Sequence, residues 1–253
     1  MDPVILLLIV ASGLATALGA VPLVAIRTLS QRTHDILLGF TGGLMVTVVV
    51  LGLLPHAAAH SGADPTAVAA SVVLGMLLVV GLARAVRRLP LPKAFGGSSG
   101  SSAPRLAFVL FLALAIHHFP EGLATGVGYG EGLTATGNGI ALAIGLQNIP
   151  EGFLVAIAVL RETGSRRAAA LYAAASGVVE PLAGIVGYLW LSVSPADLAL
   201  ASGFAGGAML AAVLTQVLPE SHRHGNRVPA TLTFVLGIAL TAGVWIALGA
   251  LAL

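Results

Sequence analysis

The clearest chemistry in this chain belongs to two histidines and a glutamate inside one apolar stretch, His117-His118-Phe119-Pro120-Glu121-Gly122. A glutamate in the middle of a hydrocarbon-length helix is costly to bury as a bare charge, so such a group usually pairs, binds an ion or lines a wet path. His117 and Glu121 are four residues apart, and a helix therefore presents both on one face. The spacing is typical of a metal-ligand pair.

A related pattern follows in the next apolar segment, Gln147-Asn148-Ile149-Pro150-Glu151-Gly152. Again a nitrogen- or oxygen-bearing side chain lies four residues before a glutamate. Two such helices packed together would aim two carboxylates, two imidazoles and two amides at one space. Divalent transition-metal binding inside a membrane is the chemistry that needs such a set.

The proline and glycine of each motif have a physical meaning. Pro120 and Pro150 lack an N–H, which leaves the carbonyl four residues earlier without its helical donor. In hydrocarbon such a carbonyl must find another partner, such as a cation, a water or a hydroxyl. Gly122 and Gly152 permit close approach of a neighbouring helix. Two departures from helix rules at the same offset from a glutamate indicate a functional site.

The composition places these motifs in a membrane. The chain has 253 residues, of which 57% are hydrophobic and 9% charged, with a mean hydropathy of +1.00, whereas a soluble domain carries about 25% charged residues. The apolar runs are ~20 residues or longer, which favours spanning helices over strands. There is no cysteine, which excludes disulfides and thiolate metal sites. A net charge of +2 is too small to suggest a nucleic-acid partner, so membrane lipid is the expected environment.

We expect a single transmembrane domain, 1–253, with eight helices and one flexible cytoplasmic linker at about 87–104. The first apolar run is too long, and its start too poor in basic residues, for a cleaved signal peptide. The linker is rich in glycine and serine. The expected spans are about 3–26, 35–54, 66–85, 106–129, 133–160, 168–191, 198–218 and 228–253.

The basic residues predict the orientation. All twelve lysines and arginines follow the first, third, fifth or seventh span, and none follows the second, fourth or sixth. Because short cytoplasmic loops are enriched in lysine and arginine, this pattern predicts that both termini lie outside. The expected location is the plasma (inner) membrane of a prokaryote, crossed several times.

The acidic residues divide into two groups. Six lie in loops or at helix ends, namely Asp2, Asp35, Asp64, Glu131, Glu162 and Asp197. Four lie within or at the edge of apolar segments, each beside a proline, namely Glu121, Glu151, Glu180 and Glu220. Glu180 either bonds to a neighbouring helix or joins the same centre as a third carboxylate. Glu220 and His222 lie near the predicted cytoplasmic end, where a solvated helix end is the alternative interpretation.

Ligand chemistry narrows the ion. Imidazole with carboxylate and amide oxygens, and no thiolate, suits zinc, ferrous iron, manganese, cobalt or nickel better than copper(I). Magnesium and calcium prefer sites built only from oxygen. We hypothesise that Glu121 and Glu151 bridge two ions, because two cations would screen the repulsion between the carboxylates.

Four motifs, in order, resemble those of the ZIP metal transporters (zinc- and iron-regulated transporter-like), particularly their prokaryotic GufA-like branch. They are His117 to Gly122, Gln147 to Gly152, Ser176-Gly177-Val178-Val179-Glu180-Pro181 and Leu218-Pro219-Glu220-Ser221-His222. The likeness covers the whole chain in topology and is at motif level in the fourth to seventh spans.

The resemblance implies an all-α integral membrane fold in which helices 1–3 and 6–8 form an inverted repeat around helices 4 and 5. It implies one metal site made by His117, Glu121, Gln147 and Glu151. It implies a second made by His118, Asn148 and Glu180 with the shared Glu121 and Glu151, and a release path past Glu220 and His222. Divalent metal, zinc first and then iron, manganese, cobalt or cadmium, would be carried to the cytoplasm as substrate, with no cofactor, by alternating access. The resemblance also allows a homodimer.

The chain departs from the family pattern at three places. Relatives commonly have asparagine where this chain has His118, so the extra imidazole would tighten the second site or change its metal preference. Relatives often have an acidic residue where this chain has His56. The linker, often histidine-rich in relatives, has no histidine between Gly96 and Ser102.

Two other classes of function stay open at this point. An integral-membrane di-metal enzyme would need an open coordination position and a substrate cleft, and it would bind metal without translocating it. A proton-coupled carrier would use the carboxylates as a relay, and it would not bind metal at neutral pH.

Overall fold

The computed structural model describes residues 2–59, 64–88, 103–193 and 197–249, and within these ranges it contains helices and connecting turns but no strand. The predicted linker at about 87–104 falls mostly outside these residues. The helices are α1 (Pro3–Leu18), α2 (Gln31–Thr47), α3 (Leu54–Ala59), α4 (Pro65–Arg88), α5 (Ala103–Gly128), α6 (Ala135–Thr163), α7 (Arg166–Gly177), α8 (Val179–Val193), α9 (Leu198–Ala212), α10 (Leu218–His222) and α11 (Arg227–Ala247).

The described helices are long and apolar enough to confirm a membrane protein. Seven stretches, each at least 21 residues long, pass the test of length and hydropathy: Pro3–Val24, Gln31–Ala59, Pro65–Val86, Ala135–Thr163, Arg166–Leu191, Leu198–His222 and Arg227–Ala247. The 26-residue α5, which carries the first motif, supplies a further helix between the third and fourth of these. The predicted all-α membrane fold is therefore correct.

Two of the observed spans end later than predicted. The second and seventh spans extend past Pro55 and Pro219, because π-helical turns at Val48–Leu53 and Val213–Val217 carry each helix into its proline without ending it. A proline that removes one helical hydrogen bond is accommodated where the backbone already departs from the α pattern.

The sixth span is interrupted near its middle. Helix α7 ends at Gly177 and α8 begins at Val179. Pro181 explains the break, because it has no N–H to donate to the carbonyl of Gly177, four residues earlier. Glu180 consequently lies at the start of a helix in the centre of the molecule.

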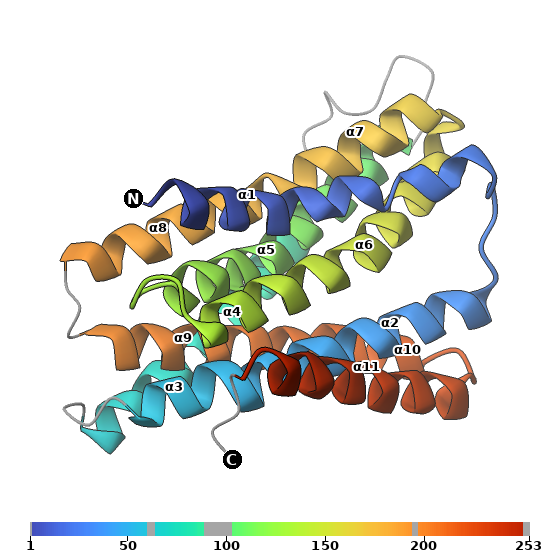
Figure 1. Cartoon of the computed structure of the whole chain (residues 1–253). Coiled ribbons are helices and arrows are strands. Elements are labelled where there is room, and N and C mark those ends of the chain that lie inside the picture. The colour runs from blue at the N-terminus through green and yellow to red at the C-terminus, as the bar shows by residue number, and fades with distance from the viewer. Residues whose placement is uncertain (1, 60–63, 89–102, 194–196, 250–253) are drawn as a thin grey trace.

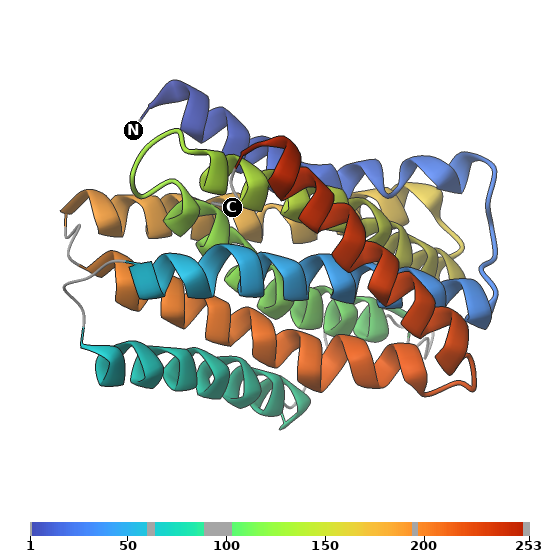
Figure 2. The same cartoon turned by 60° about the horizontal axis from the view of Figure 1, so that its bottom comes forward.

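The helices form two layers that run side by side (Figures 1 and 2). One layer contains α1, α5, α6, α7 and α8, and the other contains α2, α3, α4, α9, α10 and α11. In Figure 1 the loops rich in arginine, after the 3₁₀ turn Val21–Val24, after α6 and after α10, lie to the right. We call this the basic end of the molecule, and the N-terminus lies at the opposite end.

The packing has an internal two-fold pattern. Helix α1 packs on α6 as α8 packs on α5, and α2 packs on α11 as α9 packs on α4. The sequence carries the same relation, since one constant interval separates Ser12 from Ser176, Phe40 from Phe204 and Pro55 from Pro219. Because the paired spans run in opposite directions, the repeat is inverted. The inverted arrangement expected from the resemblance is therefore present in the helix pairing.

Candidate metal centre

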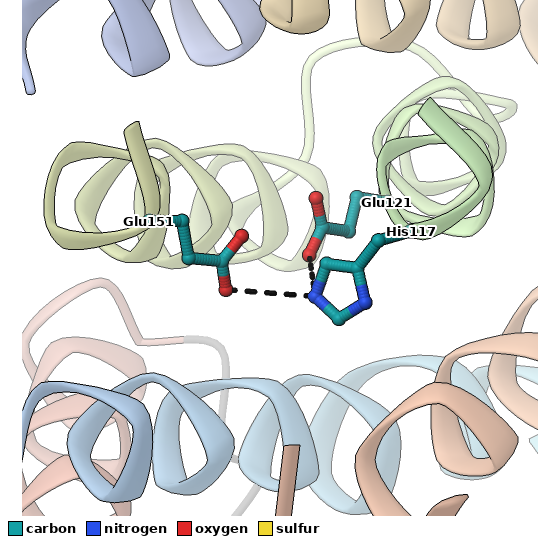
Figure 3. Close-up of side chains that lie close together, drawn as sticks. All are labelled: His117, Glu121 and Glu151. Carbon is teal, nitrogen blue, oxygen red and sulfur yellow. Dashed lines mark ion pairs between the residues drawn. The ribbon is translucent and has the colours of Figure 1, made fainter. Parts of the chain in front are cut away.

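The two motifs meet at the interface of α5 and α6. The Nε2 atom of His117 lies 3.5 Å from Glu121 Oε1 and 3.6 Å from Glu151 Oε1. Figure 3 shows His117 and Glu121 reaching out from α5 and Glu151 from α6 toward one point. One ligand atom from each of these three buried residues falls within 4.8 Å of the other two, a spacing that can hold a metal ion.

A second imidazole faces the other sides of the same two carboxylates. The Nε2 atom of His118 lies 3.9 Å from Glu121 Oε2 and 3.8 Å from Glu151 Oε2. Each glutamate thus turns one oxygen toward His117 and the other toward His118. This is the arrangement in which two carboxylates can bridge two ions.

The buried polar atoms without a protein partner concentrate here. Among the residues that the structure describes, eight buried side-chain nitrogen or oxygen atoms have no hydrogen-bond partner, and six of them belong to the two motifs. These six are His118 Nε2, Glu121 Oε2, Gln147 Oε1, Asn148 Oδ1, Glu151 Oε1 and Glu151 Oε2. An unpartnered buried polar group is expensive, so this concentration indicates that something else satisfies these atoms. Five of them are oxygens and one is an imidazole nitrogen, which is a donor set for a cation.

Hydrogen bonds from neighbouring helices fix the tautomer of His118 and the orientation of the Asn148 amide. His118 Nδ1 lies 2.9 Å from the carbonyl oxygen of Ser176, which can only accept, so Nδ1 carries the proton and Nε2 keeps its lone pair. Asn148 Nδ2 donates to the carbonyl of Ser12 at 2.9 Å, which leaves Oδ1 free. Ser12 and Ser176 are equivalent in the repeat, as are His118 and Asn148. Such outer hydrogen bonds orient ligands toward a metal.

Both carboxylate oxygens of Glu180 accept hydrogen bonds from protein side chains. Its Oε1 accepts from Ser12 Oγ at 2.7 Å and its Oε2 accepts from Asn148 Nδ2 at 2.5 Å. The side chain is fully buried. In this conformation Glu180 positions Asn148 beside the centre.

Gln147 supports the other carboxylate. Its Nε2 donates to Glu121 Oε1 at 2.6 Å, and its Oε1 is one of the unpartnered atoms. The centre therefore collects side chains from α1, α5, α6 and α8, with the carbonyl of Ser176 from α7.

The motif glycines hold the four helices together. A Cβ on Gly122 would overlap the carbonyl oxygen of Glu180, and a Cβ on Gly152 would overlap that of Thr16. The predicted close approach at these glycines is therefore confirmed. Thr16 and Glu180 occupy equivalent positions in the two repeats, so the same contact occurs once in each repeat. They keep α8 against α5 and α1 against α6, which brings Ser12 and Glu180 to the centre.

One cavity reaches the centre from the basic end. This cavity of about 340 Å³ is lined by His34, Leu38, His117, Glu151, Leu154, Val155, Ala158, Gln216, Val217 and Glu220. Toward the opposite end Ala124, Val127, Ile140 and Ile144 are fully buried in a continuous apolar core. Of the predicted ligands, His117 and Glu151 face the open side, while His118, Asn148 and Glu180 are sealed.

The remaining predicted residues lie apart from the centre. Glu220 lines the mouth of the cavity, but His222 points elsewhere, with Nε2 3.0 Å from Thr231 Oγ1 and Nδ1 3.0 Å from the carbonyl of Leu218. His56 lies at the opposite end, 3.2 Å from Glu131. The structure thus joins the seven predicted central residues and leaves His222 and His56 outside.

Sequence reasoning missed two contributors to the centre. Ser12 lies within the first predicted apolar span and contacts both Glu180 and Asn148. Gln216, whose Nε2 is unpartnered, lines the cavity. The repeated Ala-Ser-Gly at 11–13 and 175–177 is the signal that would have singled out Ser12.

The fold and the centre define a helical membrane protein with a buried cluster of carboxylates, imidazoles and amides whose spacing could hold a metal ion. Comparison with known proteins makes this more specific, because residues 95–249 match the family model described as ZIP Zinc transporter. The chain belongs to the ZIP family of metal transporters. Because this is a family of transporters, the interpretation as a membrane enzyme is set aside.

Three relatives show how far the similarity extends. The chain is 36% identical to zinc transporter GufA of Myxococcus xanthus, over 94% of this chain and 96% of the relative. It is 37% identical to zinc transporter ZIPB of Bordetella bronchiseptica, over 93% of this chain and 78% of the relative. It is 35% identical to zinc transporter ZupT of Shigella dysenteriae, over 85% of each.

Proposed function

We propose that this protein carries divalent transition metal, zinc in the first place, across the inner membrane of a prokaryote into the cytoplasm. The observation that carries the proposal is the group of six unpartnered buried polar atoms on His118, Glu121, Gln147, Asn148 and Glu151. Iron, manganese, cobalt and cadmium suit the same donor set and would be secondary substrates. The three relatives are named zinc transporters, which supports zinc as the first substrate.

Two ions bind together in this proposal. The first is held by His117, Gln147 and one oxygen from each glutamate, and the second by His118, Asn148 and the other two oxygens. Glu180 enters the second set when an ion replaces Asn148 Nδ2 as the partner of its Oε2. The charges of Glu121, Glu151 and Glu180 offset the cost of removing a divalent ion from water.

The direction of release follows from the cavity and the basic loops. Since loops rich in arginine lie on the cytoplasmic side of membranes, the cavity beside His117 and Glu151 faces the cytoplasm. The structure is then an inward-facing state, and uptake requires a second state that opens the opposite end. The inverted repeat supports such alternating access, because exchanging the conformations of the two repeats interchanges the open and closed ends.

Metal uptake into proteoliposomes tests the proposal. Wild-type protein and Glu151→Ala are reconstituted into separate vesicles that contain a metal indicator. Zinc, iron(II), manganese and cadmium are then added outside in turn. Uptake by the wild type that vanishes in the variant supports transport through this centre, and the ranking of the ions identifies the substrate. Metal binding without uptake of any ion would contradict it.

A further inference from the structure

The largest fully buried side chain among the described residues is Trp245, in the last turn of α11. Helix α11 begins beside the arginine-rich loop after α10, so its last turn lies at the end opposite the basic end, which we call the closed end. Tryptophan is rarely buried completely, because it is large and carries a polar N–H. Trp245 belongs to the apolar core that fills the closed end. No step of the proposed transport uses it, so its burial indicates another role.

The indole of Trp245 lies in a slot made by two glycines, one from each layer. A Cβ on Gly139 of α6 would lie 3.3 Å from three ring atoms of the indole, and a Cβ on Gly52 would lie 3.1 Å from its Cζ2 atom. A side chain at either position would therefore displace the ring. Gly139 belongs to the layer that carries the metal centre, whereas Gly52 and Trp245 belong to the other layer. The indole thus fills the interface between the two layers.

The polar atom of this indole has no acceptor in the slot. Trp245 Nε1 is buried and without a hydrogen-bond partner in the part of the chain that the structure describes. A buried donor without a partner destabilises the state that buries it, because the same group is hydrogen-bonded when it meets water. The apolar ring therefore favours the closed interface, while its N–H is satisfied only when water reaches it. A side chain with these two properties suits a contact that must open and close.

The other repeat lacks this indole. The interval that relates Pro55 to Pro219 also relates Gly52 to Gln216 and Gly81 to Trp245. Gln216 lines the open cavity at the basic end. Gly81 has no side chain, and a Cβ built on it would meet no atom within 4 Å. The repeats therefore differ at this position, with an indole at the closed end and a glycine at the equivalent place in the other repeat.

We propose that Trp245 is a plug that holds the closed end shut in this state, and that its indole leaves the slot at Gly139 when that end opens. The proposal rests on the proposed function, because it assigns Trp245 a part in alternating access. A contact made in only one of two states shifts the equilibrium toward that state. Since the other repeat has Gly81 in place of this ring, the plug biases the protein toward the state that is open at the basic end.

Cysteine labelling in vesicles tests the plug without measuring transport. Ala143 lies one helical turn after Gly139 on α6 and is buried in the same core as the indole. The thiol of Ala143→Cys should resist membrane-impermeant maleimide added outside right-side-out vesicles. Adding Trp245→Ala should make this thiol react about tenfold faster, because the closed state loses the contact that stabilises it.

A second cysteine distinguishes a plug from an ordinary core residue. Ala158 lines the cavity at the basic end, so labelling of Ala158→Cys in inside-out vesicles reports how often that end is open. Trp245→Ala should slow this labelling, because it shifts the protein away from the state that is open there. Trp245→Phe keeps an aromatic ring in the slot and should restore most of both rates. A general loosening of the core would speed labelling of Ala143→Cys without slowing that of Ala158→Cys.

Trp190→Ala is the matched control. Trp190 lies at the same end, but it is 40% exposed and its Nε1 donates to Asp197 Oδ2 at 3.0 Å, so neither labelling rate should change. Thermal unfolding of each variant checks that it is folded. If Trp245→Ala does not fold, Gly139→Ala replaces it, because the added Cβ displaces the indole and should move both rates in the same directions.

Two results would overturn the proposal. One is an unchanged rate at Ala143→Cys when the indole is removed or displaced, and the other is a faster rate there without a slower rate at Ala158→Cys. Neither rate requires metal to cross the membrane. A failure of uptake is therefore distinguishable from a failure of the plug.

Discussion

Glu121 and Glu151, on neighbouring helices, each place one oxygen near His117 Nε2 and the other near His118 Nε2. Two ionised carboxylates this close repel one another, and cations between them would screen that repulsion. We therefore expect bound metal to stabilise the interface of the two helices.

Removing either glutamate should reduce the number of bound zinc ions below that of the wild type and reduce uptake to background. Glu121→Gln and Glu151→Gln keep the side-chain size but cannot bridge two ions. Elemental analysis of purified protein gives the number of ions per chain, and Glu162→Gln is the control. If both variants still bind the wild-type number, the two glutamates do not bridge.

Ser12→Ala should weaken zinc binding about tenfold, although Ser12 is not proposed as a ligand. It removes the Oγ donor to Glu180 and leaves a buried carboxylate oxygen unpaired, at a cost of about 1–3 kcal/mol in the free energy of unfolding. Calorimetric titration and chemical unfolding measure the two effects.

Ser176→Ala is the matched control, because the two serines are equivalent in the repeat but use different atoms. The Ser176 hydroxyl donates only to Ala173 within its own helix, and His118 contacts the main-chain carbonyl. Zinc affinity should therefore change far less than in Ser12→Ala. Equal losses in both variants would show that Glu180 has no special role.

Gly152→Ala should destabilise the protein by about 1–3 kcal/mol, as overpacking does, because its Cβ would meet the backbone of Thr16. The Tm in detergent should fall and zinc affinity should fall with it, since α1 carries Ser12. Gly81→Ala and Gly243→Ala, at open positions of α4 and α11, are the controls. An unchanged Tm in Gly152→Ala would mean that α1 and α6 do not pack closely.

A single cysteine in the cavity should be labelled from the cytoplasmic side. The chain has no cysteine of its own, so Ala158→Cys gives a unique thiol on the cavity wall. Membrane-impermeant maleimide should modify it in inside-out vesicles and not in right-side-out vesicles.

Ala143→Cys, on the same helix but fully packed in the core, should resist labelling from both sides in the inward-facing state. Labelling of Ala158→Cys only from the outside would reverse the proposed orientation. This pair of variants therefore tests the topology independently of transport.

The periodic and compositional features of the fold were predictable from sequence. Hydrocarbon-length apolar runs predicted the helices, and the i, i+4 spacing placed His117 with Glu121 and Gln147 with Glu151 on single helix faces. These features depend only on residues close in sequence. The π-helical turns before Pro55 and Pro219 and the break at Val178 were not predicted, because a proline inside a span can end, bend or merely loosen a helix.

The choice of contacts between distant helices depended on packing. Asp35 illustrates this, because the sequence placed it only in a loop or at a helix end, yet it is fully buried and contacts Asn226 and His224, far along the chain. Glu180 illustrates it too. Sequence left open whether it bonds to a neighbour or to a metal, and Ser12 and Asn148 hold it in this structure.

By itself, the sequence determined that the chain spans a membrane, which side chains could bind metal and which class of ion they suit, because these follow from composition, local spacing and donor chemistry. Tertiary structure decided which carboxylate oxygen faces which imidazole, that Ser12 joins the centre, and that the cavity opens at the basic end. The physical reason is steric: α1 meets α7 where Gly13 and Gly177 let their backbones approach, and that crossing sets which faces of distant helices meet.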